Sequence, residues 1–376
     1  PEKAKWFSGD ASKEVKIPIG KSMLKDGFEY MSFKTKDMLS NALLCGGVGS
    51  GKTNFLKGII TSLSLNYSTD ELELWLVDMK NRASFRVFNN CNLPYATIYA
   101  FSAESELIND LFFQLRKQMD ERYIYFSQFS IDNLEDAAKL ENIDQSKLRR
   151  IVVVIDEFAT IFTDDAPFLD EIANNLLSII QKGRAMGINL LLAAQNFSNI
   201  KSSSFNQAIT LIPTRILLKS SPEAAQSILG YNNKGSFEIT KIGHGLINNN
   251  FGELNNDGGN YFFRSFLLDN EDLEPIISEI KKEVNVKGFK VNEVKFIDAA
   301  QAAKFEENTI LIDQLNQKTY DETFVKSGMA CYLGESFLIT NNNHFSFKWK
   351  INGRQSTQNI LIAGNEREHT SQALFS

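Results

Sequence analysis

A glycine-rich run in the first sixth of the chain carries the residues best suited to hold a triphosphate. It fits the pattern GxxxxGK(S/T), with a short apolar run before it and a helical pattern after it. Glycines let the backbone turn its N–H groups around a β-phosphate, and the helix N-terminus adds positive potential. We expect Lys52 to reach the β- and γ-phosphates of ATP and the Thr53 hydroxyl to ligate Mg²⁺. The predicted nucleotide-binding residues are Gly46, Gly47, Val48, Gly49, Ser50, Gly51, Lys52, Thr53 and Asn54.

An acidic pair follows the most apolar strand that the sequence predicts. Residues 151–155 are five β-branched residues in a row, and Asp156 and Glu157 come directly after them. The carboxyl ends of neighbouring parallel strands meet at one edge of a sheet, so we expect Asp156 to hold the magnesium through its water shell. Glu157 would then orient and deprotonate the attacking water. Taken alone, the pair fits a surface cap equally well; together with the phosphate loop it predicts hydrolysis of a nucleoside triphosphate.

Gln195 follows another apolar strand, residues 190–194. A neutral amide at that edge can touch both the γ-phosphate and the lytic water, and so report hydrolysis to the rest of the chain. The alternative is a polar residue that merely ends a strand. Gln195 is therefore a third candidate catalytic residue beside Lys52 and Glu157.

A long stretch of the sequence contains cations and no acids. No aspartate or glutamate lies between Glu171 and Glu223. Such a strip suits a nucleic-acid path or an ATP site completed across a subunit boundary, although solvated faces beside an apolar sheet explain it as well. Arg215 is the first candidate for an arginine finger acting in trans, and Arg184 is the second. The cations of the stretch are Lys182, Arg184, Lys201, Arg215 and Lys219.

The elements that position these residues alternate between strands and helices. Apolar runs and four-residue spacing over some 200 residues predict an α/β domain with a mainly parallel central sheet. The character changes near residues 284–290, where polar, asparagine-rich segments begin. We therefore expect an extended N-terminal segment (1–40), an ATPase domain (41–284) and a smaller C-terminal α+β accessory segment (285–376). Short strands are predicted there at 294–297, 310–312, 330–339 and 345–351, and residues 359–364 resemble the start of a second, degenerate module.

Composition narrows the class of protein. The 376 residues carry a net charge of -6, which argues against a surface that coats nucleic acid everywhere. No apolar run is long enough to span a membrane and no leader is visible, so we expect a cytoplasmic chain without direct membrane contact. Three cysteines and three histidines lie far apart, which makes a structural zinc site improbable. The first residue, Pro1, suggests a piece of a longer, membrane-associated protein.

Several phrases in order resemble the FtsK/SpoIIIE family of ring-forming translocases. They are IPIG (17–20), the phosphate loop, VDMK (77–80), QMDERY (118–123), RIVVVIDEFA (150–159), KGRAMGI (182–188), AAQ (193–195), IPTRI (212–216), GHG (243–245) and the segment 264–282. The resemblance implies a RecA-like ATPase that works as a hexamer on duplex DNA or, in the type VII secretion branch, on proteins. Lys52, Thr53, Asp156, Glu157 and Gln195 would inherit their roles at matching positions.

The chain also departs from the family pattern. Met79 stands where the family has proline, and Asn196 and Phe197 replace an Arg-Pro pair. The C-terminal part does not resemble a winged-helix DNA reader, so chromosome segregation is not the first choice. The leading expectation is a ring motor that translocates double-stranded DNA in a mobile-element, conjugation-like or phage-defence system, with an effector or membrane-anchored protein as a further partner. The alternatives are a type VII secretion-like ATPase acting on proteins and an ATP-switched oligomeric scaffold.

Overall fold

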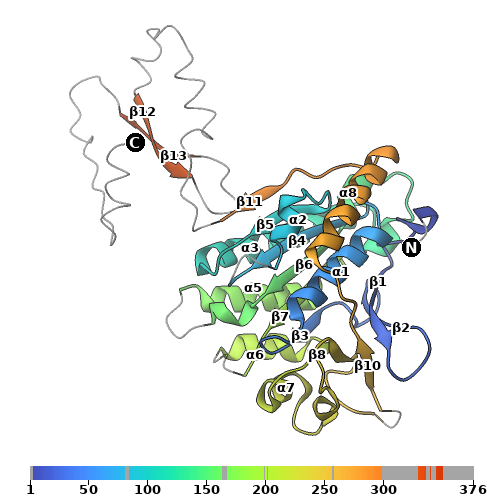
Figure 1. Cartoon of the computed structure of the whole chain (residues 1–376). Helices are drawn as coiled ribbons and strands as arrows, with labels where there is room; N and C mark the ends of the chain where they lie inside the picture. Colours follow the sequence, from blue (N-terminus) through green and yellow to red (C-terminus); the bar gives the residue numbers. More distant parts are fainter. Residues whose placement is uncertain are drawn as a thin grey trace. The chain divides into compact units, whose positions relative to one another are not determined.

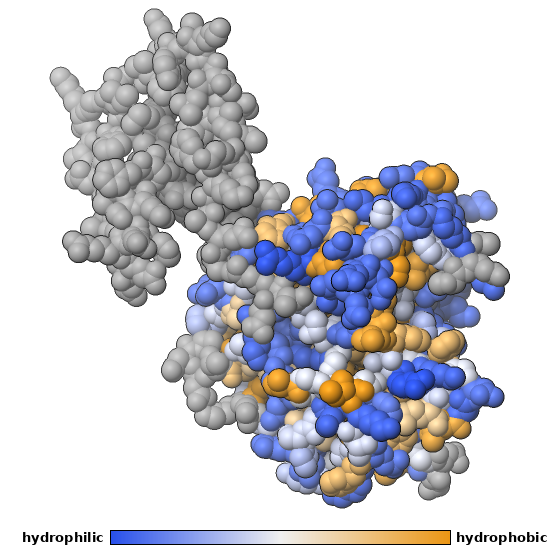
Figure 2. Space-filling model, viewed as in Figure 1, coloured by the Kyte–Doolittle hydropathy of each residue, from blue (hydrophilic) through white to orange (hydrophobic). Residues whose placement is uncertain are grey.

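The computed structural model describes residues 3–80, 84–162, 167–198, 200, 202–255, 258–298, 329–335, 339 and 344–349. The chain divides into two compact units, Pro1–Ile297 and Asp298–Ser376. Among the described helices, none is long and apolar enough to cross a membrane. On the face that Figure 2 shows, polar residues predominate among the described residues, and apolar ones lie in groups between them.

Within the described part of the first unit, eleven strands form one mixed sheet in the order β11-β5-β4-β6-β7-β3-β8-β9-β10-β1-β2 (Figure 1). The seven strands from β11 to β8 pair in parallel, and the remaining strands pair antiparallel. The strands are β1 (Glu14–Ser22), β2 (Phe28–Lys34), β3 (Ala42–Cys45), β4 (Leu72–Asp78), β5 (Ala96–Ala100), β6 (Arg150–Asp156), β7 (Ile188–Ala194), β8 (Thr214–Leu218), β9 (His244–Asn248), β10 (Asn260–Arg264) and β11 (Lys295–Ile297).

Helices cover both faces of this sheet. Helices α1, α2 and α8 lie on one face, and α3, α5 and α6 lie on the other (Figure 1). The α-helices are α1 (Lys52–Asn66), α2 (Arg86–Asn90), α3 (Ser105–Ser127), α4 (Leu134–Ala137), α5 (Leu169–Lys182), α6 (Ser203–Thr210), α7 (Pro222–Leu229) and α8 (Asn270–Val286). The 3₁₀ turns are η1 (Lys3–Lys5), η2 (Gln145–Lys147), η3 (Phe158–Ile161) and η4 (Gly235–Glu238).

The central strands are buried along their whole length. All seven residues of β6 and all seven of β7 are buried, as expected for strands covered by helices on both sides. The predicted α/β fold with a mainly parallel sheet is confirmed. One detail differs from the sequence-based expectation: β7 lies between β3 and β6, so the strand that ends at the acidic pair is not the direct neighbour of the strand before the phosphate loop.

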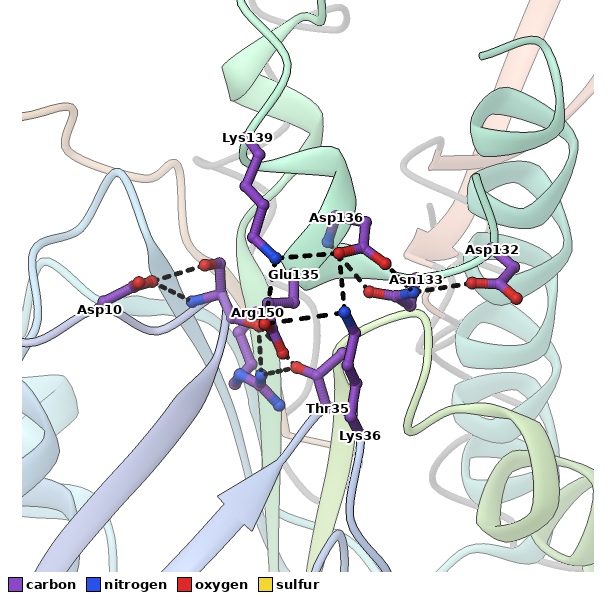
Figure 3. Close-up of polar contacts among 10 residues, drawn as sticks. Asp10, Thr35, Lys36, Asp132, Asn133, Glu135, Asp136, Lys139 and Arg150 are labelled. Atoms are coloured by element: carbon purple, nitrogen blue, oxygen red, sulfur yellow. Dashed lines mark hydrogen bonds and ion pairs between the residues drawn. The ribbon is translucent and has the colours of Figure 1, made fainter. Parts of the chain in front are cut away.

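The N-terminal segment belongs to the same unit as the parallel strands. The extended N-terminal segment that we expected contains strands β1 and β2, and through the pairing of β1 with β10 it is part of the same sheet. The buried Arg150 at the start of β6 fastens this segment, donating to the Ala11 carbonyl at 2.5 Å and to the Thr35 hydroxyl at 2.6 Å. Figure 3 shows Arg150 beside Thr35. Close by, Lys36 pairs with Asp136 at 2.7 Å.

The predicted boundary near residue 284 also moves. Strand β11 pairs in parallel with β5, which carries the first unit on to Ile297. In the second unit, β12 (Met329–Glu335) and β13 (His344–Trp349) form an antiparallel pair close to two of the predicted strands. The predicted strand at 310–312 and the module predicted from residue 359 lie outside the described residues.

Candidate active site

The phosphate loop connects β3 to α1, and two of its glycines adopt conformations that favour glycine. Gly49 has a φ of 71° and Gly51 a φ of 95°, in the left-handed region that disfavours side chains. A Cβ on Gly46 would lie 2.7 Å from the Ser50 hydroxyl oxygen. The Gly47 N–H donates to the Lys219 carbonyl at 2.9 Å, which ties the loop to the chain that follows β8. The loop is thus a narrow backbone cradle of the kind that fits phosphate.

Lys52 lies between the two predicted carboxylates. Its Nζ is 2.5 Å from Oδ1 of Asp156 and 2.5 Å from Oε1 of Glu157. The three side chains are 7%, 4% and 12% exposed, respectively. Because buried charges need partners, each carboxylate and the ammonium stabilise one another here. The structure therefore brings together the cation expected to hold phosphate and the acids expected to act on metal and water.

Glu157 has a strained backbone. Its φ is 59° and its ψ is 36°, a left-handed conformation that costs a non-glycine residue about 1–3 kcal/mol. Such strain concentrates at functional sites, where surrounding contacts hold it. One of those contacts is Gln195, whose Nε2 donates to Oε1 of Glu157 at 2.9 Å. Gln195 thus reaches the predicted base directly, from the end of β7.

Two residues that sequence reasoning gave no role complete this centre. Ser84 donates its hydroxyl to Oδ2 of Asp156 at 2.6 Å. Asp78, which ends β4 opposite Asp156, accepts the backbone N–H groups of Lys80 and Ser84, each at 3.0 Å. Asp78 therefore holds the backbone of Ser84, which in turn contacts Asp156. The signal in the sequence was an acid at the end of an apolar strand, the same signal that identified Asp156.

A cavity of about 620 Å³ lies over this centre. That volume is typical of sites for small molecules and cofactors. One wall is the phosphate loop, the start of α1 and the carboxylates; the other comes from Ile242 and from residues 267–270. Asn54 lines the cavity, but its amide bonds the backbone of that second wall, donating to the Phe266 carbonyl at 2.5 Å and accepting from the Leu268 N–H at 2.8 Å. This placement disfavours the direct nucleotide contact predicted for Asn54.

The residues present fit a magnesium nucleotide. Thr53 and Asp156 both line the cavity and carry hard oxygen atoms of the kind that Mg²⁺ prefers, and the ion typically takes only one or two carboxylates beside phosphate and water. The glycine cradle and Lys52 match the charge and size of the phosphates.

Arg215 does not occupy the position of an arginine finger. It lies buried on β8, and its guanidinium donates to the carbonyls of Ile212 at 2.8 Å, Ile228 at 2.9 Å and Ile209 at 2.8 Å. Burial lowers the pKa of Arg215 to about 10, so the group stays charged at neutral pH. Since Ile209 and Ile228 lie in the last turns of α6 and α7, Arg215 caps two helix ends, and the finger predicted at this position is not supported.

The predicted basic strip does not form one surface. Lys182 ends α5 and Arg184 follows it, at the amino edge of the parallel strands, whereas Lys219 follows β8 at the carboxyl edge. Arg215 is buried, and Lys201 lies outside the described residues. The gap in acidic residues along the sequence therefore does not gather its cations into a single path.

Comparison with known proteins places this geometry in a family. Residues 5–199, just over half of the chain, match the model of the FtsK/SpoIIIE family. The ESX secretion system protein YukB of Bacillus subtilis is 25% identical over 251 residues, which cover 63% of this chain and 16% of that protein. The ESX secretion system protein EccC of Geobacillus thermodenitrificans is 24% identical over 192 residues, which cover 50% of this chain and 13% of that protein. The chain thus spans less than a fifth of these relatives.

Solved structures share the fold. The cytoplasmic domain of the type VII secretion ATPase EccC of Thermomonospora curvata superposes with a TM-score of 0.60 at 20% identity, covering 74% of this chain and 32% of that one. The pCW3 conjugation coupling protein TcpA superposes with a TM-score of 0.55 at 21% identity, covering 74% of this chain and 72% of that one. With the family model matched over more than half of its length, the chain belongs to the FtsK/SpoIIIE family, and it is an ATPase.

Proposed function

We propose that this chain is the ATP-driven motor of a type VII-like secretion machinery and acts on protein substrates. The observation that carries the proposal is the kind of relative that it matches: both curated relatives described above are ESX secretion system proteins. The working unit in this proposal is a ring, a hexamer by family analogy, on the cytoplasmic side of a membrane and beside a membrane-anchored partner.

The charge distribution supports protein over duplex DNA. A DNA path needs cations gathered along one surface to displace counterions from the phosphates. Here Lys182 and Lys219 lie at opposite edges of the sheet. Arg215 is buried, and its guanidinium donates to backbone carbonyls. The acid-free stretch of the sequence therefore does not indicate a path for DNA.

Glu157 is the base in the proposed reaction. Its carboxylate takes a proton from water while the water oxygen bonds to the γ-phosphorus, and the bond from that phosphorus to the β–γ bridging oxygen breaks. Gln195, which donates to Glu157, fixes the direction of that carboxylate. Lys52 exchanges its two carboxylate partners for phosphate oxygens. Bound Mg²⁺, held by Thr53 and Asp156, would neutralise charge on the phosphates.

Translocation of duplex DNA is the second candidate. It is favoured by the fold shared with the conjugation coupling protein TcpA. In either case Arg184, at the amino edge of the sheet, is the proposed arginine finger from a neighbouring subunit.

One experiment separates the two substrates. Phosphate release by the purified oligomer is measured alone, with duplex DNA, and with peptides from secreted proteins of the same cell, at about 50 and about 200 mM salt. We expect stimulation by a peptide and no salt-dependent stimulation by DNA. Stimulation by DNA that disappears at the higher salt would overturn the protein proposal in favour of the second candidate. Glu157→Gln protein supplies the background rate.

A further inference from the structure

The second wall of the nucleotide cavity exposes apolar side chains. Ile242 is 69% exposed and Leu267 is 78% exposed, although both line the cavity. The carboxylates of Asp156 and Glu157, with Lys52, define where the γ-phosphate must lie. The second wall, which also carries Asp269, therefore remains for the rest of the nucleotide. When a flat ring covers exposed branched side chains at such a place, apolar surface is removed from water and the free energy falls.

Backbone hydrogen bonds attach this wall to the phosphate loop. The Gly243 N–H donates to the Ser50 carbonyl at 3.2 Å, and the Ser265 N–H donates to the Gly243 carbonyl at 2.8 Å. A Cβ built on Gly51 would lie 3.9 Å from Cγ2 of Ile242. The segment around Ile242 therefore lies directly against the loop, and the segment around Ser265 lies against it in turn.

Asn54 attaches the second segment to α1. Its amide takes both a carbonyl and an N–H of the backbone on either side of Leu267, at Phe266 and Leu268. Leu268 also packs on α1, with Cδ1 3.9 Å from a Cβ built on Gly58. Because the residues before and after it are both held, Leu267 is kept at the cavity with its side chain exposed.

We propose that Ile242 and Leu267 form the subsite for the nucleobase of ATP, and that Asn54 is a positioning residue that holds Leu267 there. The inference rests on the ATPase activity. It assigns the base of the nucleotide to the part of the cavity that the phosphate loop does not line. Apolar contact of this kind adds affinity for the nucleoside and none for the phosphates. The two parts of the ligand can therefore be tested separately.

Leu267→Ser tests the subsite directly. Affinities for Mg-ATP and for magnesium tripolyphosphate are measured by calorimetry on the oligomer. We expect the ATP affinity to fall about tenfold, as for a lost apolar contact, while tripolyphosphate changes less than about twofold. Leu254→Ser, at a leucine that is 51% exposed and outside the cavity lining, is the matched control and should change neither. Equal loss of both ligands, or no loss of ATP, overturns the proposal.

Asn54→Ala tests the positioning role. We expect the same pattern, ATP weakened by roughly 3- to 10-fold and tripolyphosphate nearly unchanged, with KM for ATP rising by more than kcat falls. Asn66→Ala, on the last turn of the same helix, removes an amide that bonds only the Ser62 carbonyl among the described residues and is the control. An equal loss of tripolyphosphate would mean that Asn54 contacts phosphate, against the proposal. Lys52→Ala loses both ligands, which distinguishes failure of nucleotide binding from failure of the subsite.

Discussion

Replacement of Arg215 by alanine should destabilise the fold rather than remove a catalytic group. The Arg215 guanidinium donates to three carbonyls at 2.8–2.9 Å, two of them in the last turns of α6 and α7. The last four carbonyls of a helix have no partner within the helix, and a buried end must find one elsewhere. Arg215 provides those partners together with a positive charge, which also favours helix C-termini.

The size of the effect follows from the carbonyls left behind. The Ile209 carbonyl also accepts the Ile212 N–H at 3.2 Å and keeps that partner, so the cost is counted for the carbonyls of Ile212 and Ile228. An unsatisfied buried carbonyl costs about 1–3 kcal/mol, which puts the loss of unfolding free energy at roughly 2–6 kcal/mol. For a unit of this size each kcal/mol lowers Tm by about 2–4 °C, so a fall of roughly 5–20 °C is expected.

Thermal unfolding and phosphate release, measured on the same samples, check this prediction. Arg215→Ala should lower Tm by that amount, and below its transition it should retain turnover. Mixing it with Glu157→Gln subunits should give no gain over the separate proteins, whereas a finger in trans would be rescued at mixed interfaces. Arg184→Ala is the control for loss of an arginine outside the core and should leave Tm within about 2 °C. Unchanged Tm with abolished turnover in Arg215→Ala would refute the capping role.

Three further outcomes follow from the site and the core. Glu157→Gln should lower kcat by about 10²- to 10⁴-fold while ATP still binds, and a loss below tenfold would contradict its role as base. Ser84→Ala, which frees an oxygen of Asp156, should raise the Mg²⁺ concentration for half-maximal hydrolysis by roughly 10-fold or more; an unchanged Mg²⁺ dependence would mean that Ser84 does not orient the ligand. Burial raises the pKa of the Cys45 thiol from 9.0 to about 12, so the unfolded chain ionises first and stability falls as pH rises above 9. Between pH 9 and 10 urea unfolding should show a loss of about 1 kcal/mol that Cys45→Ala does not show, and equal pH slopes in the two proteins would contradict this prediction.

The sequence predicted which side chains meet at the ends of the parallel strands. Asp156, Glu157 and Gln195 each follow an apolar strand, and the carboxyl ends of parallel strands share one edge. That rule requires neither the strand order nor the helices between the strands, so it holds although β7 lies between β3 and β6. Asp78 obeys the same rule and would have been found by applying it to every strand.

Domain limits were harder to predict because strand pairing is not local. Strand β1 reaches the sheet through β10, more than 200 residues later, and β11 joins through β5, almost 200 residues earlier. Composition near residue 284 changes where α8 ends, but a polar surface helix and a short edge strand do not look different from a linker in sequence. The first unit therefore extends beyond both predicted boundaries.

The roles predicted for Arg215 and Asn54, arginine finger and nucleotide contact, are not supported for a common physical reason. Each lies within a few residues of a motif, and position along the chain says nothing about which polar group a long or forked side chain will satisfy. Buried helix ends and loop backbones must find donors and acceptors, and these two side chains provide them. A cation inside an apolar stretch such as residues 212–218 is therefore better interpreted first as a partner for backbone carbonyls, because its burial would otherwise be costly. By that reasoning Arg184, which follows a helix outside any strand, is the better candidate to meet a neighbouring subunit.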